Sequence, residues 1–332
     1  MTHWLAILCV IASFITSVSA TEPDRETIQR AVERGLLVLE RGAKAYPSNQ
    51  TCFACHHQTL PMLAMTAARD AGLRFDAELF RDQRDFTRKS FNDRKARLTK
   101  GEHVGGRAAT VSYGLWALQL AGDKPDELTE AMTSYLLSVQ QPDGSWKPPS
   151  NRPPLESSSV SCTVLVAWTL REFTTDAQCE QVTLAIRRAK DWLATTSLDE
   201  QEDLNFALWG ARLLDQSNER IDSLKQRVLD VQQPDGGWRQ KHDLSSDAYA
   251  TGQTLFVLSE TGTLATDAAH RKGVEYLLHT QETDGSWHVV TRSKPIQPWF
   301  DNGDPHEKDQ FISMTASGWA TAALARSLGS IR

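Results

Sequence analysis

The hydrophobic residues of this chain follow a helical period through most of its length. Apolar positions recur three and four residues apart, as in Met132, Tyr135, Leu136 and Val139, which is the spacing of one face of an α-helix. Charged amphipathic stretches alternate with stretches rich in Ala, Thr, Trp and Leu, and no strand pattern competes. The chain is therefore predicted to be all-α.

Six helical hairpins are predicted. The first helices, which carry the charge, are expected near residues 25–42, 76–98, 126–140, 180–195, 219–232 and 265–280. The second helices, which are more apolar, are expected near residues 57–72, 106–121, 158–172, 203–215, 247–262 and 312–328. Because apolar helices are buried, the second helices should form an inner ring and the first helices an outer ring. Six such pairs close into a single (α/α)6 toroid.

A short motif recurs at the turn between the two helices of a hairpin. It reads Gln-x-x-x-Gly-x-Trp and begins at Gln140, Gln232 and Gln281. These starts lie 92 and 49 residues apart, so the first interval fits two units of about 46 residues with a degenerate unit between them. The Asp-Gly step inside each copy is typical of a turn.

This motif resembles the QW motif of squalene and hopene cyclases, whose toroids resemble protein prenyltransferase subunits. The resemblance covers residues 100–330 by motif and residues 25–100 by helix pattern. It implies that each glutamine caps a helix end and that the tryptophans, Trp146, Trp238 and Trp287, pack on the turns. Neighbouring outer helices would thereby be joined. The chain also resembles exported bacterial repeat proteins that carry Cys-x-x-Cys-His-His in the first hairpin.

The resemblance does not carry a complete active site over to this chain. Squalene and hopene cyclases protonate their substrate with an Asp-x-Asp-Asp cluster, and the chain contains none. The nearest candidate is Asp247 at the predicted start of an inner helix, where a helix cap is the competing interpretation. A prenyltransferase would need Asp, Cys and His zinc ligands on late inner helices, and those helices contain no cysteine.

Cys52, Cys55 and His56 form a Cys-x-x-Cys-His motif, and His57 follows it directly. This is the attachment pattern of haem c, in which the thiols bond the vinyl groups and the histidine binds iron. A zinc site and a disulfide or redox dithiol are the alternatives. The three residues are therefore predicted to bind a cofactor, with haem c as the main expectation and zinc as the alternative.

Ring closure is expected to bring further histidines toward this motif. The motif replaces the turn of the first hairpin, while His103 lies in the turn of the second hairpin and His306 in that of the sixth. All these turns lie on one face of a toroid, so His56, His57, His103 and His306 are the predicted metal ligands. For His103 and His306, solvated turn residues are the competing interpretation.

Other polar residues are assigned structural roles. Asp309 is predicted to cap a helix. Cys162 is predicted to be a small core residue, and a disulfide with Cys179 is not expected because a separation of ~16 Å exceeds the ~7 Å limit between Cα atoms. The histidines predicted to be solvated are His242, His270, His279 and His288.

Four tryptophans recur on the predicted inner helices, namely Trp116, Trp168, Trp209 and Trp319. Core packing is the first interpretation. If the rings face the axis, they would instead line a central pocket for an isoprenoid, another apolar molecule or a sugar. Proline-rich loops at 147–155 and 294–298 are placed to cover the mouth of such a pocket.

The first twenty residues resemble a secretory signal, with an apolar run from Leu5 to Val18 and a predicted cleavage site after Ala20. An uncleaved anchor is the alternative. The toroid domain is expected to span residues 21–332, to be exported to the periplasm or beyond, and to contain no later membrane span. The formal net charge of −6, with scattered basic residues, argues against nucleic-acid binding.

Three functions remain open from the sequence. In the first, a haem c site serves redox or electron-transfer work with a partner protein, beside a central apolar pocket. In the second, the chain is a non-catalytic binding module with a structural Cys/His zinc site. In the third, it is a divergent terpenoid cyclase that acts on an apolar or isoprenoid molecule.

Overall fold

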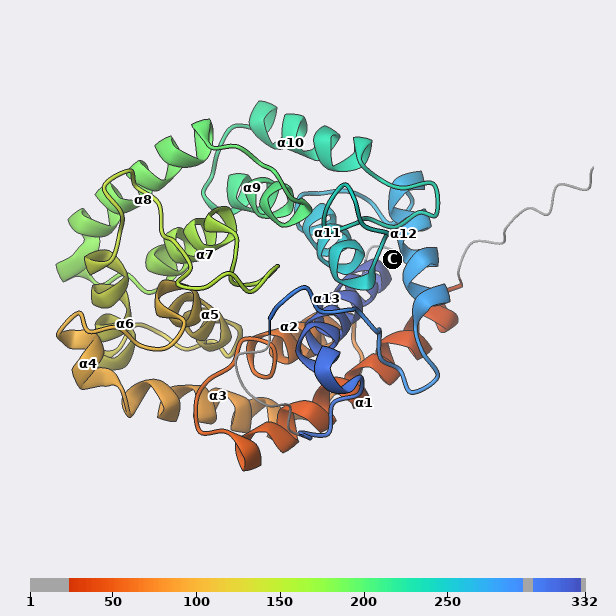
Figure 1. Ribbon diagram of the computed structural model, residues 1–332, viewed down its shortest axis with the longest axis horizontal. Coiled ribbons are helices and arrows are strands. Elements are labelled where there is room, and N and C mark those ends of the chain that lie inside the picture. Colours follow the sequence, from red (N-terminus) through yellow and green to blue (C-terminus); the bar gives the residue numbers. More distant parts are fainter. Residues whose placement is uncertain (1–23, 295–300, 330–332) are drawn as a thin grey trace, which may run out of the picture.

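The computed structural model describes residues 24–294 and 301–329. Within these residues the chain forms thirteen α-helices and two short 3₁₀ turns, with no β-strand. The helices are arranged as two concentric rings that surround one axis (Figure 1). The predicted all-α (α/α)6 toroid is confirmed.

The outer ring contains the first helix of each hairpin. Its members are α1 (Arg25–Asn49), α3 (Ala77–Asn92), α6 (Glu127–Ser138), α8 (Cys179–Thr195), α10 (Asn218–Asp230) and α12 (Ala268–Thr280). The inner ring contains α2 (Thr59–Asp70), α5 (Arg107–Leu120), α7 (Ser159–Glu172), α9 (Gln201–Leu213), α11 (Ala248–Glu260) and α13 (Gln310–Gly329). The short elements are α4 (Lys95–Thr99), η1 (Asp176–Gln178) and η2 (Glu307–Asp309).

All twelve predicted helices are present, and their ends differ by a few residues. The largest difference is at α1, which continues to Asn49 because Ala43 and Tyr46 extend its buried face. The degenerate unit is the hairpin of α8 and α9, whose connection is only five residues long. The predicted signal, residues 1–20, lies outside the described residues. Among the helices of the described part, none is both long enough and apolar enough to cross a membrane.

Each Gln-x-x-x-Gly-x-Trp turn joins two neighbouring outer helices. The glutamine Nε2 donates one hydrogen bond within its own turn and a second to a backbone carbonyl of the next outer helix. The carbonyls of the next helix are those of Ala185 in α8, Ala269 in α12 and Ala31 in α1, at 2.9, 2.8 and 2.9 Å. We call each of these arrangements a QW clamp.

The tryptophan of each clamp ties the turn to the hairpin that contains it. Its indole Nε1 donates to a carbonyl in the preceding outer helix, and its backbone N–H donates to a hydroxyl on the inner helix. The carbonyls belong to Leu136, Val228 and Leu277, and the hydroxyls to Thr163, Thr251 and Ser317. All three tryptophan side chains are fully buried. The clamps thus perform the joining role that the resemblance implies.

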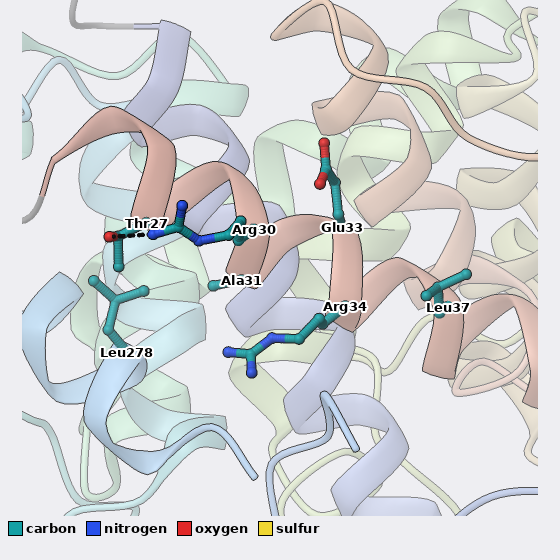
Figure 2. Close-up of a pocket in the computed structure, with 7 residues that line it drawn as sticks. All are labelled: Thr27, Arg30, Ala31, Glu33, Arg34, Leu37 and Leu278. Carbon is teal, nitrogen blue, oxygen red and sulfur yellow. Dashed lines mark hydrogen bonds between the residues drawn. The ribbon is translucent and has the colours of Figure 1, made fainter. Parts of the chain in front are cut away.

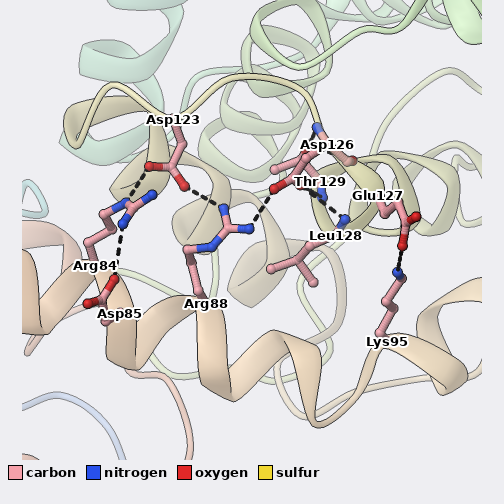
Figure 3. Close-up of polar contacts among 9 residues, drawn as sticks. All are labelled: Arg84, Asp85, Arg88, Lys95, Asp123, Asp126, Glu127, Leu128 and Thr129. Carbon is pink, nitrogen blue, oxygen red and sulfur yellow. Dashed lines mark hydrogen bonds and ion pairs between the residues drawn. The ribbon is translucent and has the colours of Figure 1, made fainter.

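The junction between the second and third hairpins uses charge instead. Between α3 and the turn that precedes α6, Arg84 and Arg88 both contact Asp123 at 2.5 Å, and Arg88 also contacts Asp126 at 2.5 Å (Figure 3). Asp123 is nearly buried, with a side-chain exposure of 3%. Because this carboxylate pairs with two guanidinium groups and is shielded from water, these ion pairs stabilise the junction more than isolated surface ion pairs do.

The last clamp closes the ring. Gln281 at the end of α12 bonds Ala31 in α1, and Arg34 donates to the side-chain oxygen of Gln281 at 2.5 Å. Beside them, α13 packs against α1 and α2 (Figure 1). The first and last hairpins are therefore neighbours, as predicted.

The tryptophans of the inner helices meet at the axis. The ring centroid of Trp116 lies 6.0, 5.2 and 5.9 Å from those of Trp168, Trp209 and Trp319. Phe256 from α11 joins them, 5.4 Å from Trp319. These five rings, which we call the aromatic layer, come from five different inner helices and are buried. Core packing is therefore their role at this level of the toroid.

A glycine pair tests how much the ring-closing contact contributes. Gly285 and Gly262 both have positive φ, 94° and 85°, so alanine costs about 1–2 kcal/mol at either. At Gly285 a Cβ would also lie 2.5 Å from the carbonyl oxygen of Arg34 in α1, whereas at Gly262 nothing lies within 4 Å. We expect Gly285→Ala to lower the free energy of unfolding by about 3 kcal/mol or more, and Gly262→Ala by about 1 kcal/mol. Urea denaturation measures both, and equal losses would contradict the expectation.

Candidate functional site

A buried carboxyl group lies in the first turn of inner helix α9. Glu202 is 3% exposed, and its Oε2 accepts hydrogen bonds from the Tyr249 hydroxyl and from the Gln253 amide, each at 2.8 Å. Its other oxygen, Oε1, has no hydrogen-bond partner among the described residues. The site therefore holds a buried carboxyl group with one oxygen hydrogen-bonded and the other without a partner among the described residues.

An amide network fixes the orientation of these donors. The Gln253 side-chain oxygen accepts from the Asn205 amide at 2.9 Å, so the Gln253 NH₂ group must face Glu202. Asn205 in turn accepts from the Gln201 amide at 2.9 Å and is fully buried. Gln201 donates to Asn205, which donates to Gln253, which donates to Glu202. This chain of hydrogen bonds fixes the orientation of the Gln253 donor before any ligand binds.

Burial decides the protonation state of Glu202. It raises the pKa from its ordinary 4.5 to about 8, against the hydrogen bonds from Gln253 and Tyr249, which lower the pKa. Glu202 is therefore a neutral carboxylic acid at pH 7. Because both donors bind Oε2, the proton belongs on Oε1, the oxygen without a partner.

Side chains from four inner helices converge near Glu202. The pKa of the Tyr113 hydroxyl lies well above its ordinary value, first because of burial and then because of the nearby Glu202, Cys55 and Cys162. The Tyr113 ring lies 5.8 Å from Trp116 and so borders the aromatic layer. We call Tyr113, Cys162, Glu202, Tyr249 and Gln253 the polar cup.

Two loops meet where the proline-rich cover was predicted. The loop between α6 and α7 reaches toward the centre of the ring (Figure 1), and the carbonyl of Pro153 in that loop accepts from the Ser293 hydroxyl at 3.1 Å. Arg292 binds Glu200, just before α9, at 3.0 Å. Of the second predicted stretch, 294–298, only Lys294 lies within the described residues.

The sequence candidate Asp247 is a helix cap. Its Oδ1 accepts from the backbone N–H of Ala250 at 2.9 Å, and its Oδ2 accepts from the Gln240 amide at 3.0 Å. Burial raises the pKa of Asp247 to about 6. Both oxygens are occupied, so Asp247 lacks the free oxygen that distinguishes Glu202.

Sequence reasoning missed Glu202, although a signal exists. It lies within an acidic stretch at the start of α9 that contains several carboxylates, so its residue type alone does not distinguish it. Only Glu202 stands three residues before Asn205 and seven before Trp209, on the face that meets the axis. That helical register could have singled it out.

The Cys-x-x-Cys-His segment forms the turn between α1 and α2. Cys52 is exposed, Cys55 is half-buried, and both are free thiols. Burial raises the pKa of Cys55 to about 12 and lowers the pKa of His56 well below its ordinary value. The Nε2 of His56 is buried without a hydrogen-bond partner among the described residues. The segment thus contains two free thiols and a neutral imidazole whose Nε2 has no hydrogen-bond partner among the described residues.

His57 points into the ring-closing contact. It is fully buried, its ring stacks on Tyr46 at 4.4 Å, and its Nε2 lies 2.6 Å from Asp304 Oδ2. The side-chain amide of Asn302 lies 2.7 Å from the same nitrogen. His57 therefore links the first hairpin to the loop that precedes α13.

The other predicted ligand histidines contact different groups. His103 Nδ1 lies 3.3 Å from the Tyr135 hydroxyl, and His306 Nε2 lies 2.8 Å from the Ser286 hydroxyl. Throughout the described ranges, one group of three or more His, Cys, Asp or Glu has its ligand atoms within 4.8 Å of one another. It consists of Glu282, His288 and His306.

Two smaller predictions are corrected and a third is confirmed with an addition. His270 is not solvated, because α12 turns it toward α11, where it is 1% exposed and lies 3.2 Å from the Ser259 hydroxyl. His288 is exposed, as predicted, and it also has partners, since its ring stacks on His306 and its Nε2 contacts Asp309 at 3.0 Å. Asp309 uses its other oxygen to accept from the Thr291 backbone N–H, so it is a bridging residue and not a helix cap.

The outer surface carries a hollow where α1 meets α12 (Figure 2). Its volume is about 390 Å³, and its walls include Arg30, Glu33, Arg34, Leu37 and Leu278. The hollow lies outside the ring, and its charged side chains are solvated. The polar cup, where an acid is buried, is therefore the better candidate site.

The sequence matches the family model of the prenyltransferase alpha-alpha toroid domain over residues 38–201 and 197–309. The chain belongs to this family. None of the curated proteins matches the sequence.

Solved structures show the same fold. The type II terpene cyclase MstE from Scytonema matches with a TM-score of 0.60 and 16% identity, over 92% of this chain and 99% of that one. A variant of MstE in complex with its product, merosterolic acid A, matches with a TM-score of 0.60 and 16% identity, over 92% and 98%. A glycosidase variant matches with a TM-score of 0.61 and 10% identity, over 92% and 98%. At these identities the matches show the fold alone.

The raised pKa of Glu202 predicts a pH-dependent stability. Between pH 4.5 and about 8 the unfolded chain has lost this proton while the folded chain keeps it, so unfolding releases a proton and stability falls as pH rises. The loss is on the order of 1.4 kcal/mol per pH unit. We expect Glu202→Gln to remove this contribution and Glu180→Gln, on the exposed face of α8, to leave it. Urea denaturation at several pH values measures it, and parallel profiles for wild type and Glu202→Gln would contradict it.

Proposed function

We propose that this protein is an acid-catalysed enzyme of terpenoid cyclase type, with Glu202 as the proton donor. The observation that carries the proposal is a neutral, buried carboxylic acid with a free Oε1, placed where side chains of four inner helices converge. Membership of the toroid family and the fold shared with a type II terpene cyclase support the reaction class. The structure of MstE with geranylgeranyl dihydroxybenzoate as substrate supports an isoprenoid ligand class.

The acid strength of Glu202 limits the class of substrate that it can protonate. A carboxyl group with a pKa of about 8 is a weaker acid than an ordinary glutamic acid. An isolated double bond is a poor base, whereas an ether or epoxide oxygen accepts a proton far more readily. General acids with raised pKa values are suited to protonating such oxygens at neutral pH. We therefore favour an isoprenoid that carries an epoxide.

The residues of the polar cup would carry out the proton transfers of the reaction. Glu202 Oε1 gives its proton to the epoxide oxygen, the C–O bond breaks, and a hydroxyl group and a carbocation form. Tyr249 and Gln253 then stabilise the glutamate that remains, through the two hydrogen bonds already present. A neighbouring double bond of the substrate attacks the cation, and loss of a proton to Glu202 restores the acid. The product is a cyclic isomer of the substrate.

The aromatic layer is suited to the cationic intermediate. Indole faces attract positive charge when water is excluded, and Trp116, Trp209 and Trp319 are buried at the axis. Tyr113 connects this layer to the cup, since its ring lies 5.8 Å from Trp116. The acid is thus adjacent to a layer of buried aromatic rings, which pack as core and favour a positive charge beside Tyr113.

An activity assay tests the proposal. Purified protein is incubated with squalene, with an epoxide of squalene and with geranylgeranyl compounds, in H₂O and in D₂O, and the products are identified by mass spectrometry. We expect a cyclic isomer from the epoxide, and a 10²–10⁴-fold lower rate in Glu202→Gln. Glu180→Gln should retain the wild-type rate. Deuterium on carbon at the site of initiation would indicate double-bond protonation instead, and an active Glu202→Gln variant would exclude Glu202 as the donor.

A second candidate function rests on Cys52, Cys55 and His56. We propose, as the alternative, that an exported form of the protein carries haem c there, or zinc, and exchanges electrons with a partner protein. The donor set supports the proposal, because the thiols are free and His56 Nε2 is buried without a partner in the described structure. Phe311 packs on His56 at 4.7 Å, so a bound haem has to replace that contact.

The cofactor is tested by expressing the protein in a strain with haem-attachment machinery. The haem proposal expects a Soret band that survives acid–acetone extraction, that is lost in the Cys52→Ser/Cys55→Ser variant and that is kept in Cys179→Ser, whose thiol is exposed and remote in sequence. Colourless protein with one equivalent of zinc would favour the zinc alternative. Colourless, metal-free protein would exclude both.

A further inference from the structure

The last QW clamp differs from the other two at positions that bear on chemistry. Glu282 stands where the first two copies of the motif have Gln141 and Gln233. Directly after its tryptophan comes His288, where the other copies have Lys147 and Arg239. The third copy thus has an imidazole where the other two have a long basic side chain, and a carboxylate where they have an amide.

The fold adds a third donor to this pair. His306, from the loop before η2, stacks on His288 with a centroid distance of 4.5 Å and an interplanar angle of 9°. Its backbone has a φ of 74°, and Glu307 follows with a φ of 43°. Non-glycine residues rarely adopt this conformation, and it persists where the surroundings require a particular side-chain direction. The strained loop brings His306 to His288 and Glu282.

The Nε2 atom of each imidazole already has a polar partner. The Nε2 of His288 contacts the Asp309 carboxylate at 3.0 Å, and the Nε2 of His306 contacts the Ser286 hydroxyl at 2.8 Å. Both Nδ1 atoms therefore remain as ligand atoms. A histidine that binds a metal through one nitrogen typically uses the other for a carboxylate or another polar group, which sets the tautomer.

We propose that Glu282, His288 and His306 bind a divalent transition-metal ion, with zinc as the best match. Their ligand atoms lie within 4.8 Å of one another, so small side-chain rotations bring all three to a common ion. Two imidazoles and one carboxylate suit zinc and disfavour calcium or magnesium, which prefer oxygen ligands. Glu282 and His288 are exposed, so water completes the coordination.

The ion would join the last clamp to the loop at residues 301–309. The same loop supplies Asp304, which contacts His57 from the first hairpin at 2.6 Å. A metal at this position thus secures a segment on which ring closure depends. This role is independent of the acid chemistry of Glu202 and of the Cys-x-x-Cys-His segment.

Zinc binding to the full chain tests the proposal. The Cys52→Ser/Cys55→Ser background removes the competing thiols, and calorimetry and a thermal shift with zinc are measured. We expect one equivalent of zinc and a higher melting temperature. His288→Ala and Glu282→Gln should abolish or severely weaken binding, while His279→Ala, an exposed histidine of α12, should not change it.

A further variant separates metal binding from a general structural role. Asp309→Asn should lower zinc affinity by about 10–100-fold, because it removes the carboxylate that contacts His288 Nε2. The metal-free variant should keep the circular dichroism spectrum of the unsubstituted protein. Calcium should produce no shift. The proposal is overturned if the background protein binds no zinc, or if the His288 and Glu282 variants bind it with unchanged affinity.

Discussion

The closure of the ring is the constraint on which this architecture depends: α13 packs against α1 and α2, and Gln281 donates to the Ala31 carbonyl. This hydrogen bond joins the last outer helix to the first, and a ring of hairpins has one such junction that no chain connection supports. Gly285 makes the junction possible, because its φ of 94° and missing side chain let the turn approach the Arg34 carbonyl. Once the ring is closed, every inner helix directs one face to a shared axis, and residues far apart in sequence become neighbours.

The same closure explains why a protonated acid exists in this protein. Side chains from the inner helices exclude water at the axis, and a carboxyl group there keeps its proton unless enough donors oppose the effect. At Glu202, two donors act on one oxygen and leave the other free. At Asp247, both oxygens are engaged and the group serves the helix that it begins. Two buried acids therefore differ in chemical use because of their hydrogen bonds.

Sequence reasoning predicted the helices and their pairing with errors of a few residues, because the 3.6-residue period and the repeated turns are local signals. It predicted that the first and last hairpins meet, and they do so through His57 and Asp304. It did not predict Asp304 as that contact, nor Glu202 as the buried acid. The burial of His270 was also missed, because a single histidine in an amphipathic helix does not reveal which neighbour faces it.

By itself, the sequence determined the class of fold, the order of the hairpins and the clamps that join them, since each follows from short-range periodicity or from a motif within seven residues. Only the tertiary structure decided which polar residues share a site. Glu202 meets Tyr249, and His306 meets His288, because two separate helices or loops approach at a particular height and rotation. Helical period specifies which side of a segment is buried, but the partner on the opposite side depends on how all six hairpins pack.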